Sequence, residues 1–374
     1  MQAAAEKQRT LWFDYEDGSL KVIDQTLLPF QFKVLALNTL ADAVDAIVTM
    51  KVRGAPLIGI TAAFGVYLSL RSDMHSLNTA CEQLVKTRPT AVNLRWALER
   101  MRSALESVSE QQRPLHALLL AQHLLDEDVA ACSAIGNYGL QLLQDIYQQK
   151  QARHGIDTVL NVLTHCNAGW LATGAWGTAL APVYKAQLAG LPVHVWVDET
   201  RPRNQGASLT AWELGRSQVP HTLVVDNAGG HLMQHGLVDV CLVGSDRTTS
   251  AGDVCNKIGT YLKALAAYDN QIPFYAALPV STVDFASVDG VREIPIEERA
   301  AAEVTHVQGL DHAGVLRQVQ VSAPGTAVSN FGFDVTPSRL VTGIITELGV
   351  FPATAAGLLR LRELSREASS GAGH

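Results

Sequence analysis

The second half of the chain alternates short apolar runs with longer stretches of helical periodicity. The runs are rich in Val and Leu and nearly free of charge, which is typical of strands buried on both faces of a parallel sheet. The stretches between them are long enough for a helix, so the pattern predicts a doubly wound α/β domain. The expected strands are residues 158–162, 193–197, 223–225, 238–243 and 274–278.

The first half of the chain has a different pattern. Residues 12–32 alternate apolar and polar positions around Asp17-Gly18, which indicates a small β element, and helical periodicity then runs from Leu40 to about Gln149. We therefore expect a mainly helical N-terminal domain over residues 1–150 and a parallel-sheet domain over 151–360. The small polar residues of 361–374 predict a disordered tail.

Reactive or ionisable residues follow four of the expected strands. Because the carboxyl ends of parallel strands share one edge of the sheet, where α/β proteins bind ligands, we expect these groups to converge on one crevice. Some of them could instead cap helices, and for Asp226 we favour that interpretation. The residues are Cys166, Asp198 with Glu199, Asp226, and a dense polar segment with Asp246, Arg247, Asp253, Asn256 and Lys257.

The segment around Cys166 is rich in Gly, Ala and Thr. A cysteine between a strand and a helix start lies near backbone N–H groups and a positive helix end, where a thiolate is favoured. Small residues there would also let the backbone approach a phosphate. The alternative is tight packing around an inert cysteine. The glycines at 169, 174 and 177 do not have the G-x-G-x-x-G spacing of a dinucleotide site.

Two other polar segments are candidates for substrate contacts. Residues 198–206 carry donors and acceptors that could hold sugar hydroxyls, or could form a salt-bridged loop. Arg53 stands beside Gly54, Ala55 and a proline, and Arg88 also precedes a proline. An arginine in so rigid a setting can present its guanidinium fork to a phosphate, although either side chain alone could be a surface charge.

Composition narrows the class of protein. The chain has 374 residues, 47% of them hydrophobic, and a net charge of −7 with no basic run, which argues against a nucleic-acid partner. Five widely spaced cysteines predict reduced thiols in a cytoplasmic protein. The N-terminus lacks an apolar signal core, and residues 57–70 look too short and too interrupted to span a membrane, so we expect no membrane association.

Metal-dependent and serine-hydrolase chemistry find little support. His231 and His235 share one helix face, but no third ligand accompanies them, and no G-x-S-x-G elbow follows a strand. We therefore expect neither a metal nor another cofactor.

Seven blocks of sequence occur in an order that resembles the methylthioribose-1-phosphate isomerase family. The similarity extends from Trp12 to about Val350. It implies a homodimer with a helical N-terminal domain and a Rossmann-like catalytic domain, acting in methionine salvage. The blocks are RGAP at 53–56, RPTAVNL at 88–94, HCNAG at 165–169, ETRPRNQGASLTAWEL at 199–214, GSDR at 244–247, GDVCNKIGTY at 252–261 and FDVTPSRLVTGIITELGV at 333–350.

The resemblance also implies roles for individual residues. Cys166 matches the family's catalytic cysteine and Asp246 its catalytic acid/base, and no cofactor is implied. The positions that match substrate-binding residues for a small phosphorylated sugar are Arg53, Gly54, Ala55, Arg88, Gln205, Asn256 and Lys257. Sequence leaves open whether hydrogen moves from C2 to C1 through an enediol or as a hydride.

Related proteins with other functions remain alternatives. Ribose-1,5-bisphosphate isomerases would need further cations at the far end of the pocket, whereas apolar residues such as Trp170 and Trp176 near the cysteine would suit a thioether, unless they belong to the core. Regulatory subunits of a translation-initiation exchange factor are binding proteins, and they have no need for Cys166 and Asp246 together.

Overall fold

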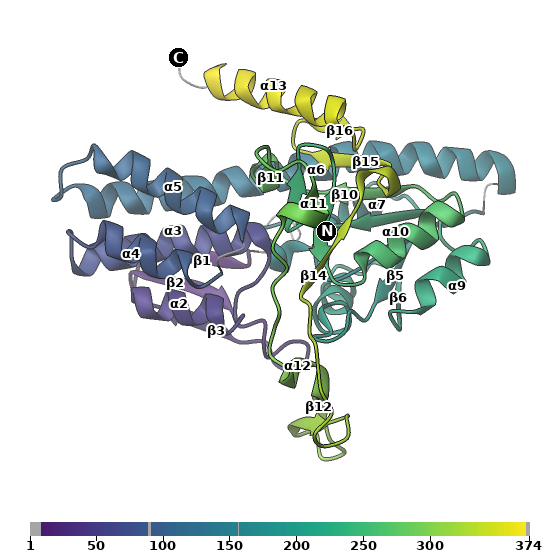
Figure 1. Ribbon diagram of the computed structural model, residues 1–374, viewed down its shortest axis with the longest axis horizontal. Helices are drawn as coiled ribbons and strands as arrows, with labels where there is room; N and C mark the ends of the chain where they lie inside the picture. Colours follow the sequence, from purple (N-terminus) through teal and green to yellow (C-terminus); the bar gives the residue numbers. More distant parts are fainter. Residues whose placement is uncertain (1–8, 89–90, 156, 372–374) are drawn as a thin grey trace.

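The computed structural model describes residues 9–88, 91–155 and 157–371. A helical N-terminal part and a sheet-containing part lie side by side, and the long helix α6 (Arg113–His154) runs along both of them (Figure 1). α6 packs against α3 (Ala55–Ser72) in the first part and α7 (Ala181–Leu188) in the second. It ends at His154, a few residues beyond the domain boundary expected near 150.

The N-terminal part combines a small antiparallel sheet with a group of helices. The turn between its first two strands is built on Gly18, whose φ of 70° suits glycine, and Asp17 accepts a hydrogen bond from the Ser19 amide. The strands are β1 (Leu11–Asp14), β2 (Ser19–Ile23) and β3 (Val34–Leu37), and the helices around α3 are α2 (Leu40–Val48), α4 (Leu77–Val85) and α5 (Val92–Glu106).

Helix α3 forms the centre of the N-terminal core. It packs against α2, α4, α5 and α6, and both Phe64 and Leu68 are fully buried. Among the described residues it is also the one helix whose length and hydropathy would allow it to cross a membrane, contrary to the expectation that this stretch is too short. Since 78% of it is buried inside the protein, its apolar character is explained by the core.

A seven-stranded sheet forms the second part, in the order β16-β15-β10-β7-β4-β5-β6. Every neighbouring pair is parallel except β15 with β16 at one edge. All five strands expected from the apolar runs are present, while β15 and β16 were not predicted. The strands are β4 (Leu160–Thr164), β5 (Val193–Asp198), β6 (His221–Val224), β7 (Val240–Val243), β10 (Phe274–Ala277), β15 (Gly343–Thr346) and β16 (Gly349–Phe351).

Helices cover both faces of this sheet, which confirms the doubly wound fold. Val162 points into a core shared with α6, α7 and α8 (Ala211–Arg216), whereas its neighbour Leu163 points into the opposite core. That second core contains side chains of α9 (Ala228–Gln234), α10 (Thr260–Asp269) and α13 (Ala355–Gly371). Burial on both faces explains the apolar runs of β4, β7 and β10, whereas β6 at the edge of the sheet is partly exposed.

The strand order reverses between β4 and β7. From β4 the chain continues outward to β5 and β6, whereas from β7 it continues in the other direction to β10 and β15. The connections on the two sides of this point diverge and leave a crevice at the carboxyl ends of the strands. Cys166 follows β4 and Asp246 follows β7, so the two candidate catalytic residues flank this reversal.

A second small sheet extends the carboxyl end of β7. In it β8 (Arg247–Thr249), β9 (Val254–Lys257) and β14 (Phe333–Thr336) pair antiparallel, and β11 (Val283–Asp284) joins β8. The register places Phe333 opposite Lys257. A separate hairpin of β12 (His306–Leu310) and β13 (Leu316–Gln320) projects from the body beside the short helix α12 (Ala302–Thr305) (Figure 1). A further short helix is α11 (Gly290–Glu293).

The prediction of a disordered tail from residue 361 is wrong as far as Gly371. Helix α13 continues to that residue, because Leu358 and Leu361 lie on one helix face and are fully buried in the second core. The small polar residues that suggested disorder lie on later turns of the same helix. Residues 372–374 lie outside the described part of the chain.

Adjacent leucines in α13 allow a direct test of this docking. Leu358→Ala should lower the free energy of unfolding by about 2 to 5 kcal/mol, because it removes a fully buried side chain. Leu359 is 56% exposed, so Leu359→Ala should change it by less than about 0.5 kcal/mol. Urea unfolding of both variants measures the difference, and equal values would show that the helix is not packed on the sheet.

Candidate active site

The crevice at the strand reversal contains a pocket between the two parts of the molecule. Its walls come from the loop before α3, the loop after β4, the segment after β7, and the end of β9. All the residues to which the family resemblance gives a catalytic or substrate-binding role line this one pocket: Arg53, Gly54, Ala55, Arg88, Cys166, Gln205, Asp246, Asn256 and Lys257.

The backbone of Cys166 is held in an unusual conformation. Its φ is 65°, in the left-handed region that non-glycine residues rarely adopt. Two threonines fix this conformation, because the Cys166 amide donates to Thr200 Oγ1 at 2.8 Å and its carbonyl oxygen accepts from Thr210 Oγ1 at 2.7 Å. Asp226 in turn accepts the amides of Thr200 and Arg201, both at 2.7 Å. The cysteine is thus presented to the pocket by a strained turn with support on both sides.

The surroundings of Cys166 differ from the expected helix start. Helix α7 begins only at Ala181, after a 3-10 turn, η1 (Trp170–Ala172), so its N-terminus is not beside the cysteine. A Cβ on Gly169 would lie 1.8 Å from Glu213 Oε2, so the space at this glycine is filled by a carboxylate of the protein. The tight-packing interpretation therefore holds for Gly169, while Cys166 itself lines the pocket.

Glu213 organises the residues that follow Cys166. This fully buried carboxylate accepts from Asn167 Nδ2 at 2.9 Å, from the Leu171 amide at 3.0 Å and from the Tyr184 hydroxyl at 2.8 Å. Burial raises the pKa of Glu213 to about 7, although these three donors act in the opposite direction. With its amide nitrogen turned to Glu213, Asn167 points its Oδ1 at Arg53.

Arg53 is oriented by that asparagine. Its Nη1 donates to Asn167 Oδ1 at 2.5 Å and its Nη2 donates to the Asn167 carbonyl oxygen at 2.8 Å. These bonds fix the plane of the guanidinium at the pocket wall. Glu213, Asn167 and Arg53 thereby connect the cysteine loop to the phosphate-binding candidates.

We expect Glu213→Gln to lower the free energy of unfolding by about 1 to 3 kcal/mol. The amide group of glutamine cannot accept from all three donors, so one buried donor loses its partner. Tyr184→Phe removes only one of those donors and should cost about 1 kcal/mol. Chemical denaturation measures both, and a Glu213→Gln variant as stable as the parent would contradict the hydrogen-bonding assignment.

The N-terminus of α3 lies at one end of the pocket and has the features of an anion-binding site. Gly54 precedes the helix with φ 99°, no side chain in the described part of the chain caps it, and a Cβ there would lie 2.4 Å from the Ala172 carbonyl oxygen. Only glycine fits this position. The unpaired amides and the positive end of an 18-residue helix favour a phosphate group beside Arg53.

Two further polar side chains have unused hydrogen-bonding capacity at the pocket. Among the described residues, Arg88 Nε and Gln205 Oε1 are buried without a hydrogen-bond partner. Arg88 also forms an ion pair with Glu297, with 3.2 Å between Nη2 and Oε2. Buried polar groups are rarely left unpaired, so a bound ligand could satisfy both.

Asp246 and Lys257 face the pocket from the other side. Burial raises the pKa of Asp246, while Lys257, Arg53 and Arg88 oppose that shift. Burial lowers the pKa of Lys257, whose Nζ donates to the Gly332 carbonyl oxygen at 2.9 Å and lies 4.9 Å from the centre of the Phe333 ring. The neighbouring Asn256 donates to Thr260 Oγ1 at 3.0 Å.

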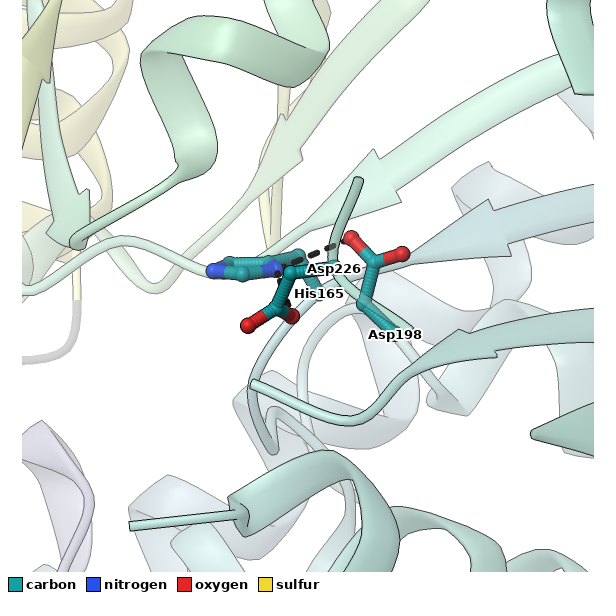
Figure 2. Close-up of side chains that lie close together, drawn as sticks. All are labelled: His165, Asp198 and Asp226. Carbon is teal, nitrogen blue, oxygen red and sulfur yellow. Dashed lines mark hydrogen bonds and ion pairs between the residues drawn. The ribbon is translucent and has the colours of Figure 1, made fainter. Parts of the chain in front are cut away.

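The carboxylates that follow β5 and β6 lie behind the pocket and not in it. Figure 2 shows the carboxylates of Asp198 and Asp226 near the same ring nitrogen of His165, Nδ1. These three side chains are close enough to hold a metal ion. However, Lys263 Nζ lies 3.1 Å from Asp198 Oδ2, so an ammonium already balances this charge. We expected Asp226 to cap the helix that follows it, α9. Its carboxylate instead supports the Thr200 turn.

The two tryptophans that were candidates for the thioether site lie elsewhere. Trp170 and Trp176 do not line the pocket, because both are buried in the core that α6 and α7 share. The apolar part of the pocket wall comes mainly from other side chains. These are Met50, Pro56, Ile58, Pro279 and Phe333.

The sequence allowed two roles for residues 198–206, substrate contacts or a salt-bridged loop, and the structure shows features of both. Gln205 reaches the pocket, whereas Arg203 forms an ion pair with Glu303 and Arg201 donates to the carbonyl oxygens of Pro202 and Val304. Most of its polar groups therefore serve the loop itself.

Known proteins are similar to this chain over most of its length. Residues 51–353 match the Initiation factor 2 subunit family. Methylthioribose-1-phosphate isomerase of Rhodospirillum rubrum is 57% identical over 363 residues, which cover 96% of this chain and 93% of that protein. The chain belongs to the methylthioribose-1-phosphate isomerase family. This finding confirms the resemblance found in the sequence.

Solved structures show the same relationship. The crystal structure of 5-methylthioribose 1-phosphate isomerase from Pyrococcus horikoshii OT3 superposes with a TM-score of 0.82 at 37% identity, covering 97% of this chain and 98% of that one. A structure described as subunit delta of translation initiation factor eIF-2B from A. fulgidus has a TM-score of 0.76 at 35% identity, with 95% and 100% coverage. The fold is therefore shared by proteins described as isomerases and as initiation-factor subunits.

Residues that support the site from behind were not identified from the sequence. Thr200, Thr210 and Glu213 lie within the block at 199–214, but nothing in their spacing shows that they clamp the loop after β4. Their contacts join segments more than 30 residues apart, as with the separation of 34 between Cys166 and Thr200.

Proposed function

We propose that this protein is an aldose–ketose isomerase that converts 5-methylthioribose 1-phosphate to 5-methylthioribulose 1-phosphate in methionine salvage. The observation that carries the proposal is the convergence of Cys166 and Asp246 at the strand reversal, beside a helix N-terminus and several cations. The isomerase relatives at 57% identity over nearly the whole chain support the same reaction.

The chemistry explains this combination of groups. Phosphate on the anomeric carbon prevents spontaneous ring opening, so the enzyme must open the ring with the phosphate in place. The α3 N-terminus with Arg53, Arg88 and Lys257 would hold the phosphate dianion. Oxidation at C2 and reduction at C1 occur within one molecule, so the reaction balances without an external oxidant or reductant.

Asp246 is suited to the proton transfers. Because burial raises its pKa, the carboxyl keeps its proton to higher pH than an ordinary aspartate, and it can donate to the ring oxygen. Cys166 would then carry the proton between C2 and C1 in an enediol route, or contact the C2 oxygen if a hydride moves. In both routes Asp246 would afterwards relay the proton at the C2 oxygen.

The apolar part of the pocket wall suits a thioether on the sugar. Met50, Ile58 and Phe333 contribute apolar surface, which suits a methylthio group better than a second phosphate. A ribose-1,5-bisphosphate isomerase remains the second candidate, because Arg203 and its ion pair with Glu303 lie in the adjoining pocket.

We further propose that the protein works as a cytoplasmic homodimer that needs neither nucleic acid nor a membrane. Val350 on β16 leaves 40% of its surface exposed, and a second copy could cover this apolar side chain. Sedimentation velocity at micromolar concentration should give a dimer, and a monomer would contradict the proposal.

Asp246→Asn should lower kcat by a factor of about 100 to 10,000, because it removes the ionisable group with almost no change in volume. In the parent protein, kcat/KM should fall as the pH rises through the raised pKa of Asp246, since the proton-donating form is then lost. A steady-state pH profile measures this. Unchanged urea unfolding would show that the variant folds, and kcat within threefold of the parent would remove Asp246 from the mechanism.

Ketose formation from two substrates tests the proposed function itself. The purified protein should convert 5-methylthioribose 1-phosphate, and Cys166→Ser should abolish that conversion. Conversion of ribose 1,5-bisphosphate alone would identify the sister activity. Conversion of neither substrate would favour a binding role like that of initiation-factor subunits.

A further inference from the structure

A buried histidine, His165, lies between β4 and Cys166, and the proposed chemistry gives it no role. The side chain is 1% exposed. Its Nδ1 lies 3.0 Å from Asp198 Oδ2, and its Nε2 lies 2.8 Å from the carbonyl oxygen of Ile258. Both ring nitrogens therefore face oxygen atoms that act as acceptors.

These contacts determine where the ring protons are. A carbonyl oxygen carries no hydrogen, so Nε2 must donate to Ile258. Asp198 Oδ2 also receives the ammonium of Lys263 at 3.1 Å, which marks it as an ionised acceptor, so Nδ1 must donate as well. An imidazole that donates from both nitrogens is an imidazolium.

Charged groups around the ring balance the positive charge of His165. Asp226 Oδ1 lies 4.0 Å from His165 Nδ1 (Figure 2). Asp198 and Lys263 are almost completely buried, so the cations of His165 and Lys263 face the carboxylates of Asp198 and Asp226. Asp334 on β14 lies on the side of α10, where it accepts the Gly259 amide at 2.7 Å, and burial raises the pKa of this carboxyl. A buried charge is tolerated only with such partners.

The bond to Ile258 joins the two walls of the pocket. His165 directly precedes Cys166, and Ile258 directly follows Lys257. The ring also packs against the next turn, since a Cβ on Gly259 would lie 3.0 Å from His165 Cε1. A single side chain thus links the end of β4 to the end of β9.

We propose that His165 is a positioning residue, held doubly protonated, that fixes the Cys166 turn against the Asn256–Lys257 end of β9. The inference rests on the proposed isomerase function. A shift of about 1 Å between a nucleophile and the groups that hold the substrate can cost about a hundredfold in rate. Loss of the bond to Ile258 should therefore affect kcat more than KM.

Two substitutions separate the two bonds of the ring. The amide nitrogen of glutamine takes the place of Nε2 and keeps the donor to Ile258, whereas that of asparagine takes the place of Nδ1 and keeps the donor to Asp198. His165→Gln should retain kcat within about tenfold of the parent, and His165→Asn should lose about a hundredfold with KM changed less than threefold. His231→Gln, an exposed site on α9, is the matched control and should match the parent.

Equal kcat values for the folded Gln and Asn variants would overturn the positioning role, as would a loss confined to KM. A second measurement does not depend on activity or on a folded variant. In the parent protein labelled with 15N-histidine, the ring nitrogens of His165 should both show protonated shifts at the pH of the assay. One unprotonated nitrogen would overturn the charge assignment, whereas a parent protein that isomerises neither substrate would overturn only the proposed function.

Discussion

The pairing of β4 with β7 is the constraint on which the site depends. These two strands lie side by side at the centre of the sheet, yet the chain leaves them in opposite directions. Their carboxyl ends consequently bring Cys166 and Asp246 to one crevice, although the two residues are far apart in the sequence. The other side of the pocket comes from the N-terminal part, whose helix α3 directs its N-terminus and Arg53 at the same space. Isomerisation of a sugar phosphate needs the reactive pair at the strand ends and also the phosphate-binding groups of the N-terminal part.

Buried polar contacts behind the pocket hold its reactive groups in place. Thr200 and Thr210 fix the strained Cys166 backbone, Glu213 orients Asn167 and through it Arg53, and His165 bonds to the turn after Lys257. Each of these supporting groups is buried, so its hydrogen bonds act without competition from water. Such support explains how a cysteine with a left-handed backbone is kept in one conformation.

The sequence predicts the strands of the large sheet well. It predicts poorly the strands and side chains that support the pocket, and the reasons are physical. The five predicted strands are rich in Val, Leu and other apolar residues, and that signal is local. The strands β8, β9 and β14 were missed because they form a partly polar sheet whose side chains serve the pocket. The tail was misjudged because the buried face of α13 rests on few residues, Leu358 and Leu361 among them, within a polar stretch. Residues such as Asp226 and Glu213 gained their roles from partners distant in the chain, which a local pattern does not contain.

A crystal structure with 5-methylthioribulose 1-phosphate bound would test the central claim most directly. The account predicts the phosphate at the α3 N-terminus between Arg53 and Arg88, with C1 and C2 of the sugar between Cys166 Sγ and the Asp246 carboxyl group. The methylthio group should then contact the apolar wall that includes Met50 or Phe333. A phosphate bound away from α3, or reacting carbons out of reach of either Cys166 or Asp246, would contradict it.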